Sequence, residues 1–158
     1  MVRAGLGFDA HRFEAGRKLI LGGVEIAGAV GLHGHSDADV LLHALTDALL
    51  GAAGLGDIGM HFPDSDPQWK NVSSRIFIER ALSLLRDKKF KIVNADITLV
   101  AESPRLDFHR GAIRNSVAAL LQLPAEAVNI KASTVDRMGF IGRNEGIAAQ
   151  AIVLIESV

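Results

Sequence analysis

Hydrophobic and polar residues alternate at the start of the chain. From Val2 to Phe8 every second residue is apolar, which is the period of a half-buried strand, and we expect that strand to end near Asp9. The segment Leu19–Ile26 has two apolar runs around a Gly-Gly pair and predicts a short hairpin. A loop rich in Gly and His follows, through Ser36.

Three later segments carry apolar residues at helical spacing, with capping residues before them. The three helices are expected to follow caps at Ser36 or Asp37, at Ser73 or Ser74, and at Asp107, and to end near Ala52, Lys88 and Pro124. Residues 57–70 contain two prolines and three aspartates and are expected to form a loop, as is a Gly-rich turn at 139–146.

Further strands are expected at Ile92–Ala101, Val128–Thr134 and Ile147–Ile155. The pattern predicts an α/β protein of the α+β type, in which a mixed sheet of about four main strands has helices on one face. The last strand is apolar on both faces, so the face without helices needs a cover. A second copy of the chain is the simplest cover, which predicts a homo-oligomer, although the chain's own loops could serve instead.

The composition limits the class of protein. A chain of 158 residues with 49% hydrophobic residues is expected to form a single domain, residues 1–158. The absence of cysteine leaves only His, Asp and Glu as metal ligands. A net charge of −1 with one Trp and no Tyr argues against nucleic-acid binding. No signal peptide or membrane-spanning segment is recognisable, so we expect a cytoplasmic protein with no membrane partner.

Charge is distributed unevenly along the chain. Residues 1–66 contain four basic and nine acidic side chains and five of the six histidines, whereas residues 67–158 contain 13 basic and nine acidic ones. Imidazole and carboxylate bind divalent cations, and Lys and Arg bind phosphate. The distribution therefore fits one domain that holds both metal and phosphate, although ordinary surface charge would produce it too.

The first strand and the first helix carry candidate metal ligands. Asp9 and His11 are two residues apart on an extended backbone and point to the same side. His43 lies on the first helix, opposite its leucine stripe. One carboxylate and two imidazoles, with a position open for substrate, suit a catalytic zinc ion. Asp47, one helical turn after His43, is a candidate partner for its imidazole.

Other candidate residues have ordinary explanations on the sequence alone. His33 and His35 in the Gly-rich loop could be surface imidazoles. Asp64 and Asp66 could bind hydroxyls or Mg²⁺, or could serve only in turns. The segment Gly5–Ala10 matches a dinucleotide-binding fingerprint, but no amphipathic helix follows it, so we reject that interpretation.

Taken together, a series of motifs closely resembles the 2-C-methyl-D-erythritol 2,4-cyclodiphosphate synthase family, in order and over essentially the whole chain. These motifs are Gly7–His11, His35–Val40, His43–Ala52, Gly56–Gly59, Phe62–Asp64 and Gly139–Gly146. The resemblance implies an α/β subunit whose sheet has helices on one side, with three subunits packing their sheets around a central axis. It also implies cyclisation of 4-diphosphocytidyl-2-C-methyl-D-erythritol 2-phosphate with release of CMP, in the non-mevalonate route to isoprenoids.

The resemblance assigns roles to individual residues. Asp9, His11 and His43 match zinc ligands, while Mg²⁺ or Mn²⁺ would be held mainly by the substrate diphosphate. His35 and Thr134 match catalytic residues that stabilise the transition state, and Ser36 accompanies His35. The loops expected to receive the methylerythritol portion contain Asp57, Ile58, Gly59, Phe62, Pro63, Asp64, Ser65 and Asp66. The cytidine and phosphate pocket, expected from a neighbouring subunit, contains Ala101, Glu102, Ser103, Pro104, Arg105, Leu106, Asp107, Ser133, Thr134, Val135 and Asp136.

Near the end of the chain, Phe140 and Arg143 also match substrate-binding positions, and Arg143 and Glu145 resemble residues beside an axial cavity that can hold an isoprenoid diphosphate. The sequence departs from the family's pattern at three positions. Arg105 replaces the expected Lys, and Ser133 and Asp136 replace Thr and Glu. Arginine offers a planar fork instead of a point donor, so these departures affect details of phosphate contact.

Two other functions use the same three ligands. A zinc-dependent phosphohydrolase would activate water at the metal. A non-catalytic oligomeric protein would use the metal for folding, so that chelation would unfold it.

Overall fold

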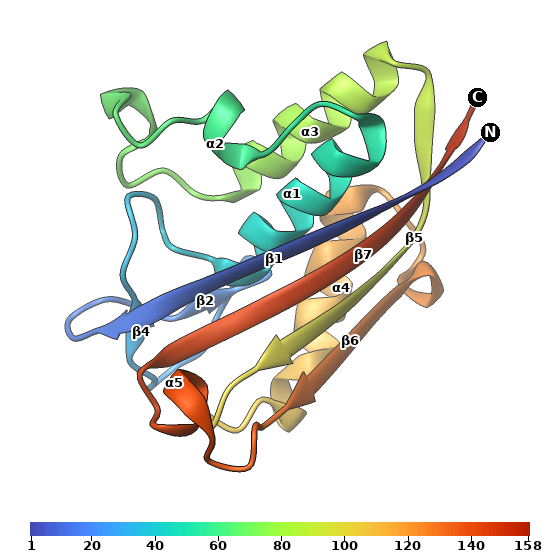
Figure 1. Cartoon of the computed structure of the whole chain (residues 1–158). Helices are drawn as coiled ribbons and strands as arrows, with labels where there is room; N and C mark the ends of the chain where they lie inside the picture. Colours follow the sequence, from blue (N-terminus) through green and yellow to red (C-terminus); the bar gives the residue numbers. More distant parts are fainter.

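The structure is a computed structural model that describes all 158 residues, and a five-stranded mixed sheet runs through it (Figure 1). Its strands, in the order in which they neighbour one another, are β4 (Gly31–Leu32), β1 (Val2–Glu14), β7 (Gly146–Ser157), β5 (Phe90–Val100) and β6 (Val128–Ser133). β7 is antiparallel to both β1 and β5, while β5 and β6 are parallel. A separate hairpin consists of β2 (Ile20–Leu21) and β3 (Val24–Glu25), as predicted.

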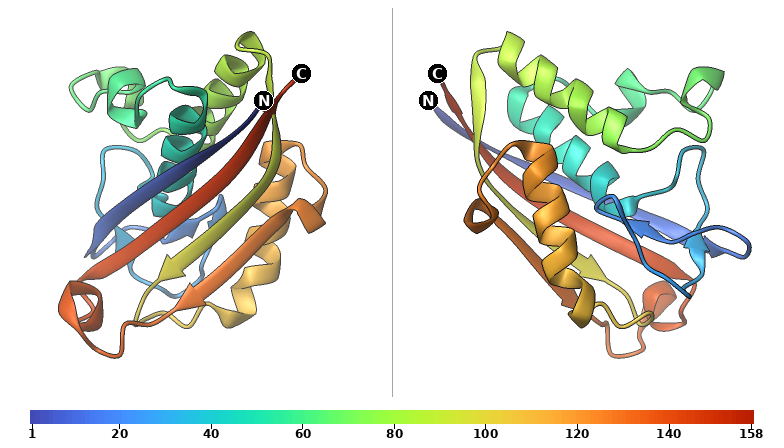
Figure 2. Two further views of the ribbon diagram at one scale, coloured as in Figure 1. Left: turned by 45° about the vertical axis from the view of Figure 1, so that its right-hand side comes forward. Right: turned by 180° about the vertical axis from the view of Figure 1, so that it is seen from behind.

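Helices cover one face of this sheet, as the view from behind shows (Figure 2). The helices are α1 (Val40–Ala53), α2 (Ile58–His61), α3 (Arg75–Asp87), α4 (Arg110–Leu121) and α5 (Gly139–Gly142), with 3₁₀ turns η1 (Pro67–Trp69), η2 (Asp107–His109) and η3 (Ala125–Ala127). The predicted fold class, a mixed sheet with helices on one face, is confirmed. No helix combines the length and the apolar character that a bilayer crossing requires.

Several predicted boundaries were wrong. β1 does not end near Asp9 but continues to Glu14, because its second half pairs with β7 and β4. The Gly-rich turn near the end of the chain contains the single helical turn α5, and the loop 57–70 contains α2 and η1. Asp57 and Asp66 accept backbone N–H groups at the starts of α2 and η1, so each begins a short helical turn there.

Two helix caps also differ from the prediction. Asp39, not Ser36 or Asp37, caps α1, and its carboxylate accepts the Leu42 N–H. At α4 the chain enters through η2, so Asp107 does not cap the helix directly. At α3, Ser74 occupies the capping position as predicted, but its side chain caps no backbone group.

The closest contact between α1 and the sheet depends on two glycines of β1. A Cβ atom on Gly5 would lie 1.9 Å from the Ala48 carbonyl oxygen, and one on Gly7 would lie 1.8 Å from that of Ala44. Both are main-chain atoms of α1, so no side-chain movement would relieve the overlap. The absence of side chains at these positions therefore lets α1 lie directly on β1, where it joins a core of 36 buried apolar residues.

The opposite face of the sheet has no helix over it and carries exposed apolar side chains. Leu6 is 61% exposed, Phe8 is 59% exposed and Ile152 is 47% exposed, while their neighbours on the same strands are buried against the helices. The prediction of a last strand with apolar residues on both faces is therefore confirmed. An exposed apolar surface on a sheet is typical of a protein–protein contact.

Asp39 links α1 to the β2–β3 hairpin. Its fully buried carboxylate accepts the N–H groups of Leu42, Gly22 and Gly23 at 2.7–3.1 Å. Burial raises the pKa of Asp39 to about 6, against the effect of these three hydrogen bonds, so the group is ionised at neutral pH. One side chain therefore satisfies three backbone donors at the junction of two elements.

We expect Asp39→Ala to lower the free energy of unfolding by about 2–5 kcal/mol, because it removes a helix cap and leaves buried N–H groups without acceptors. Urea unfolding of the variant and the wild type measures the difference. Asp39→Asn keeps one side-chain oxygen and should lose less. Equal unfolding midpoints for the alanine variant and the wild type would contradict this role.

Candidate active site

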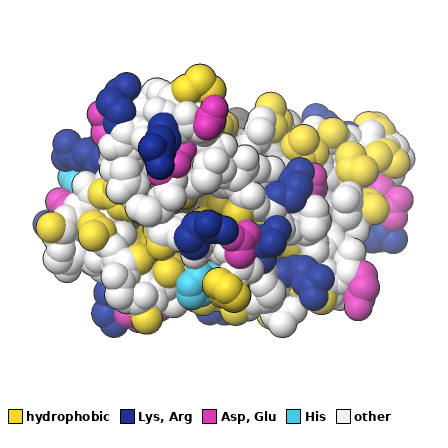
Figure 3. All heavy atoms as spheres, turned by 90° about the horizontal axis from the view of Figure 1, so that it is seen from below, with side chains coloured by type: hydrophobic (Ala, Val, Ile, Leu, Met, Phe, Trp, Pro, Cys, Tyr) yellow, Lys and Arg dark blue, Asp and Glu magenta, His cyan; other side chains and the backbone are white.

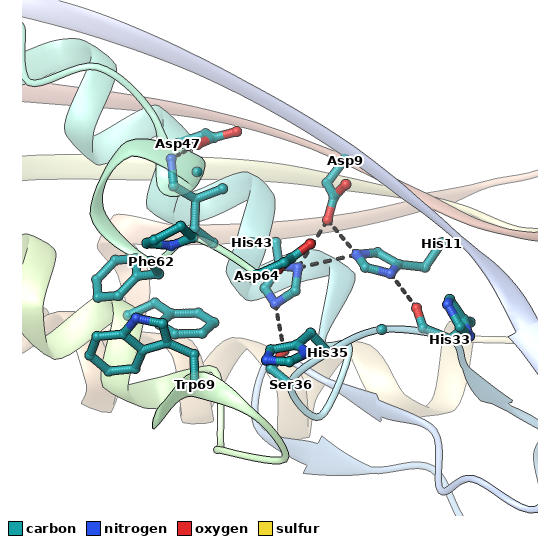
Figure 4. Close-up of a pocket in the computed structure, with 15 residues that line it drawn as sticks. Asp9, His11, His33, His35, Ser36, His43, Asp47, Phe62, Asp64 and Trp69 are labelled. Atoms are coloured by element: carbon teal, nitrogen blue, oxygen red, sulfur yellow. Dashed lines mark hydrogen bonds and ion pairs between the residues drawn. The ribbon is translucent and has the colours of Figure 1, made fainter. Parts of the chain in front are cut away.

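Asp9, His11 and His43 come together where β1 faces α1. Positions 5, 7, 9 and 11 of β1 share the face that is turned toward α1, so the close approach at the glycines brings the next two side chains up to His43. Asp9 Oδ2 lies 2.7 Å from His11 Nε2 and 3.1 Å from His43 Nδ1, and the two ring nitrogens are 3.1 Å apart. The predicted convergence of these three side chains is present (Figure 4).

Each imidazole is held by a hydrogen bond at the ring nitrogen that faces away from the other two side chains. His11 Nδ1 donates to the main-chain carbonyl of His33, which leaves Nε2 directed toward Asp9 and His43. His43 turns Nδ1 toward the same point, while its Nε2 lies 2.9 Å from the hydroxyl of Ser74 and 3.1 Å from that of Ser36. Each ring thus uses one nitrogen for a hydrogen bond and presents the other to a common point.

Asp47 does not hold His43, contrary to our expectation. Its carboxylate lines the same cavity but accepts the Ile58 N–H at 2.7 Å, and so fixes the start of α2. Burial raises the pKa of Asp47, and the nearby charges of Asp57 and Asp9 act in the same direction. Helical spacing alone placed Asp47 beside the imidazole, whereas the nearer hydroxyls come from segments distant in sequence.

The donor set fits a divalent cation. Two imidazole nitrogens and one carboxylate oxygen, all available on one side, are the ligands of many catalytic zinc sites, and the cavity leaves a further position open. Burial alone would raise the pKa of Asp9, but hydrogen bonds and charge from His11 and His43 lower it to about 2. Burial opposes protonation of His11, and the Asp9 carboxylate outweighs it, so the pKa of His11 is raised. The three side chains therefore favour a positive charge among them.

The three ligands lie in a cavity of about 770 Å³. The other residues that line it are His33, Gly34, His35, Ser36, Asp47, Ile58, Gly59, Phe62, Pro63, Asp64, Trp69 and Phe77. His35 lines the cavity, and its Nε2 is buried without a hydrogen-bond partner in the chain. Most residues predicted to receive the methylerythritol portion therefore border the candidate metal site. Asp57, Ser65 and Asp66 lie beside the cavity without lining it.

A second cavity, of about 280 Å³, lies between the end of β5 and the end of β6. It is lined by Ala101, Glu102, Pro104, Arg105, Leu106, Asp107, Ala132, Ser133 and Thr134. The view from below shows Lys and Arg side chains spread among Asp and Glu side chains (Figure 3), and Arg105 is the basic residue that lines this cavity. No residue lines both cavities, so within one chain Thr134 lies apart from His35.

The remaining predicted residues lie outside these two cavities. Ser103 lines a third cavity, of about 450 Å³, and its hydroxyl donates to Asn144. The backbone N–H of Val135 donates to Glu102, and Asp136 begins the turn toward α5 with a positive φ of 54°. Phe140 lies on α5 and is 45% exposed, and the exposed Arg143 pairs with Glu145 at 2.9 Å.

Sequence reasoning missed several residues of the site. Trp69 and Phe77 form an aromatic wall together with Phe62, which was predicted, and the Phe62 and Phe77 ring centroids are 4.5 Å apart. Arg17 donates to the main-chain carbonyls of Gly34 and Ser36, and so holds the loop that carries His35. An aromatic residue in a Pro-rich loop was a weak signal for the wall, and nothing local pointed to Arg17.

An open three-ligand group in a cavity is the arrangement of a catalytic metal site, since structural sites are closed by a fourth protein ligand. Fold and site together are therefore those of an α/β enzyme with a possible site for a divalent metal. The model of the YgbB family matches residues 2–156. A curated relative from Alkalilimnicola ehrlichii, 2-C-methyl-D-erythritol 2,4-cyclodiphosphate synthase, is 56% identical over 156 residues, which cover 98% of this chain and 95% of the relative.

Solved structures agree with this assignment. The bifunctional IspDF from Campylobacter jejuni is 43% identical, with a TM-score of 0.96 over 100% of this chain and 43% of that chain. A CDP-bound 2C-methyl-D-erythritol-2,4-cyclodiphosphate synthase is 40% identical, with a TM-score of 0.90 over 98% of this chain and 100% of that one. The chain belongs to the YgbB family, whose curated members similar to it are 2-C-methyl-D-erythritol 2,4-cyclodiphosphate synthases, and the resemblance predicted from the sequence is confirmed.

Proposed function

We propose that this chain is a phosphorus–oxygen lyase that converts 4-diphosphocytidyl-2-C-methyl-D-erythritol 2-phosphate into 2-C-methyl-D-erythritol 2,4-cyclodiphosphate and CMP. The observation that carries the proposal is the Asp9, His11 and His43 group in a large cavity, within a chain that matches the family over nearly its whole length. This cyclisation, for which its relatives are named, belongs to the non-mevalonate route to isoprenoids.

The chemistry needs no nucleophile from the protein. An oxygen of the substrate's 2-phosphate attacks the β-phosphorus, a new P–O bond closes the ring, and the bond from the β-phosphorus to the bridging oxygen breaks as CMP leaves. The task of the chain is therefore to fold the substrate so that its ends meet, and to offset the negative charge that gathers on phosphorus. This division of labour fits a protein without cysteine.

Within this proposal each part of the site has a task. Asp9, His11 and His43 would hold Zn²⁺, which would supply positive charge for aligning a phosphate, and Mg²⁺ or Mn²⁺ would accompany the substrate diphosphate. His35, which lines the cavity, would donate a hydrogen bond to a phosphate oxygen. Ile58, Gly59 and Phe62 enclose the methylerythritol portion. Asp57, Ser65 and Asp66, beside the cavity, complete these two loops.

The cytidine portion would occupy the second cavity, at residues 101–107 and 133–136, where Thr134 acts on the phosphates and Arg105 adds charge. Because no residue lines both cavities of one chain, a complete site requires the second cavity of another chain. The exposed apolar side chains on the bare sheet face support a homotrimer that would bring the two together. Solution mass measurement tests this arrangement, and a monomer with full activity would contradict it.

The trimer would also place Arg143 and Glu145 near its axis, where the resemblance predicts a cavity for an isoprenoid diphosphate. Both side chains are exposed in the single chain, which supports this placement. Phe140, also exposed, would belong to the same region.

The experiment that tests the function measures CMP release from the diphosphocytidyl substrate by purified protein with Zn²⁺ and Mg²⁺. We expect CMP and a cyclic diphosphate in equal amounts, and loss of both after chelation while the protein stays folded. A linear phosphate that carries ¹⁸O from labelled water would indicate the phosphohydrolase instead. Unfolding on chelation would indicate a structural metal.

A further inference from the structure

We propose that Ser74 and Asp37 are positioning residues for the metal site, because together they fix the tautomer of His43 that turns Nδ1 toward Asp9 and His11. The inference rests on the proposed metal-binding role of His43. Asp37 lies in the loop 35–39 and Ser74 at the start of α3. Neither residue has a direct part in the proposed reaction.

The geometry is a chain of three groups. His43 Nε2 lies 2.9 Å from Ser74 Oγ, and Ser74 Oγ makes a short hydrogen bond to Asp37 Oδ1. The other oxygen of Asp37 accepts the Ser74 N–H at 3.1 Å. Ser74 is completely buried, so no water competes for its hydroxyl. Figure 4 shows the neighbouring hydroxyl of Ser36 below the same ring nitrogen.

The chemical nature of these groups determines where the protons are. An ionised carboxylate only accepts hydrogen bonds, so the Ser74 hydroxyl donates its proton to Asp37. The Ser74 oxygen then has only lone pairs to offer, and it accepts a hydrogen bond from His43 Nε2–H. The Ser36 hydroxyl, 3.1 Å from the same nitrogen, donates to Ser74 Oγ at 3.2 Å in this arrangement. A neutral imidazole carries one N–H, so Nδ1 must present its lone pair.

Without Ser74 and Asp37, either ring nitrogen of His43 could carry the proton. Asp9 Oδ2 lies 3.1 Å from His43 Nδ1 and would accept a proton from that nitrogen equally well. A proton on Nδ1 would point into the space between the three ligands and exclude a cation. Ser74 and Asp37 oppose that state, because they provide an acceptor for a proton on the other nitrogen.

The position of Ser74 supports a role beyond helix capping. A serine at the start of a helix ordinarily accepts a backbone N–H of the first turn. Ser74 stands at the capping position of α3 but makes no such bond, and its hydroxyl is directed at His43 and Asp37 instead. The Ser74 hydroxyl therefore contacts the imidazole, the carboxylate and, at 3.2 Å, the Ser36 hydroxyl in place of a backbone group of α3.

Backbone hydrogen bonds hold the two segments together around this chain of groups. The Asp37 N–H donates to the Val72 carbonyl at 3.0 Å, and the Asn71 N–H donates to the His35 carbonyl at 2.8 Å. The start of α3 therefore cannot move without moving the loop that carries Asp37. The imidazole of His43, which lies on α1, thus contacts the start of α3 through Nε2, while its Nδ1 faces Asp9 and His11.

The test compares Ser74→Ala with Ser73→Ala in purified, metal-free protein titrated with Co²⁺. Ser73 is the adjacent residue, is exposed and contacts no part of the site, so its removal controls for a general effect at the start of α3. We expect the Ser74 variant to bind Co²⁺ about 10–100-fold more weakly, as is typical when a residue that orients a ligand is lost. The Ser73 variant should bind as the wild type does.

A second measurement needs no metal. The ¹⁵N chemical shifts of the six histidine rings in the metal-free wild type report which nitrogen of His43 carries the proton when the ring is neutral. We expect Nε2–H in the wild type and an increased share of Nδ1–H in Ser74→Ala. Asp37→Asn, which keeps an acceptor for the Ser74 hydroxyl without the charge, should lie between them.

The proposal is overturned if the wild-type ring carries its proton on Nδ1, or if Ser74→Ala binds Co²⁺ as tightly as the wild type does. A wild-type protein that binds no Co²⁺ would instead contradict the proposed metal site. The ring-nitrogen measurement would still decide the tautomer in that case, so the two failures are distinguishable.

Discussion

The His43→Ala variant is expected to release CMP about 10²–10⁴-fold more slowly than the wild type. Loss of one of three ligands removes the cation, and a metal ion at a phosphoryl group contributes several kcal/mol of transition-state stabilisation, where 1.36 kcal/mol is a factor of ten. The measurement is kcat/KM for CMP release at saturating Zn²⁺ and Mg²⁺, together with the metal content of the purified variant. Both quantities should fall together.

His109→Ala is the matched control, because His109 lies in η2 and lines neither cavity. Its activity and metal content should equal those of the wild type. Urea unfolding in the presence of a chelator should give similar midpoints for all three proteins, since the loss at His43 is a loss of the site rather than of the fold. Wild-type activity in the His43 variant would remove the basis of the proposed function.

The Gly7→Ala variant is expected to lose more than about 3 kcal/mol of folding free energy, if it folds at all. Its Cβ atom would lie 1.8 Å from the Ala44 carbonyl oxygen and 2.8 Å from the Ala48 nitrogen, so α1 would have to move away from β1. Overpacking against side chains costs about 1–3 kcal/mol, and a main-chain obstacle relaxes less readily. Thermal or urea unfolding measures the loss, and metal affinity should fall with it because the same movement separates His43 from Asp9.

Gly51→Ala gives the opposite result at a glycine of α1. A Cβ atom at position 51 would meet nothing within 4 Å, and the residue lies inside the helix. Replacing such a glycine with alanine stabilises a helix by about 0.5–1 kcal/mol. A destabilisation of similar size in both variants would show that the contact between β1 and α1 is less close than the structure indicates.

The long elements could be predicted because their patterns are local. On α3, Ile78, Ala81, Leu82 and Leu85 recur at helical spacing, and all four are buried as expected. The doubly apolar β7 was recognisable for the same reason, since its composition suits the centre of a sheet. The spacing of apolar residues within one segment was therefore enough to predict these elements.

The errors occur where distant residues decide the outcome. Residues 10–14 have no apolar alternation, and they extend β1 only because β7 and β4 supply partners. Ser36 and Asp37 had the chemistry of helix caps, but the structure uses their oxygens at His43 and Ser74. Asp39 was not recognised as the cap. Its carboxylate also accepts the N–H of Gly23, 16 residues earlier in the β2–β3 hairpin, and no local pattern indicates that contact.

The metal ligands were predictable, but their support was not. Asp9 and His11 share a face of any extended strand, and a helical His43 needed only one packing contact to join them. Their hydrogen-bond partners come from His33, Ser36 and Ser74, and Ser74 lies 31 residues beyond His43. No local pattern encodes such a contact, and the same holds for the separation of the two cavities.

The position of β7 between β1 and β5 has a consequence for the newly made protein. During synthesis on the ribosome, the strand that bears Asp9 and His11 emerges before the other strands of this sheet, whereas its main neighbour β7 is the last of them to emerge. Until residues 146–157 leave the exit tunnel, β1 can pair only with the two residues of β4. The proposed metal site should therefore assemble only after β7 has emerged, so a nascent chain that stops before residue 146 would not retain a cation there.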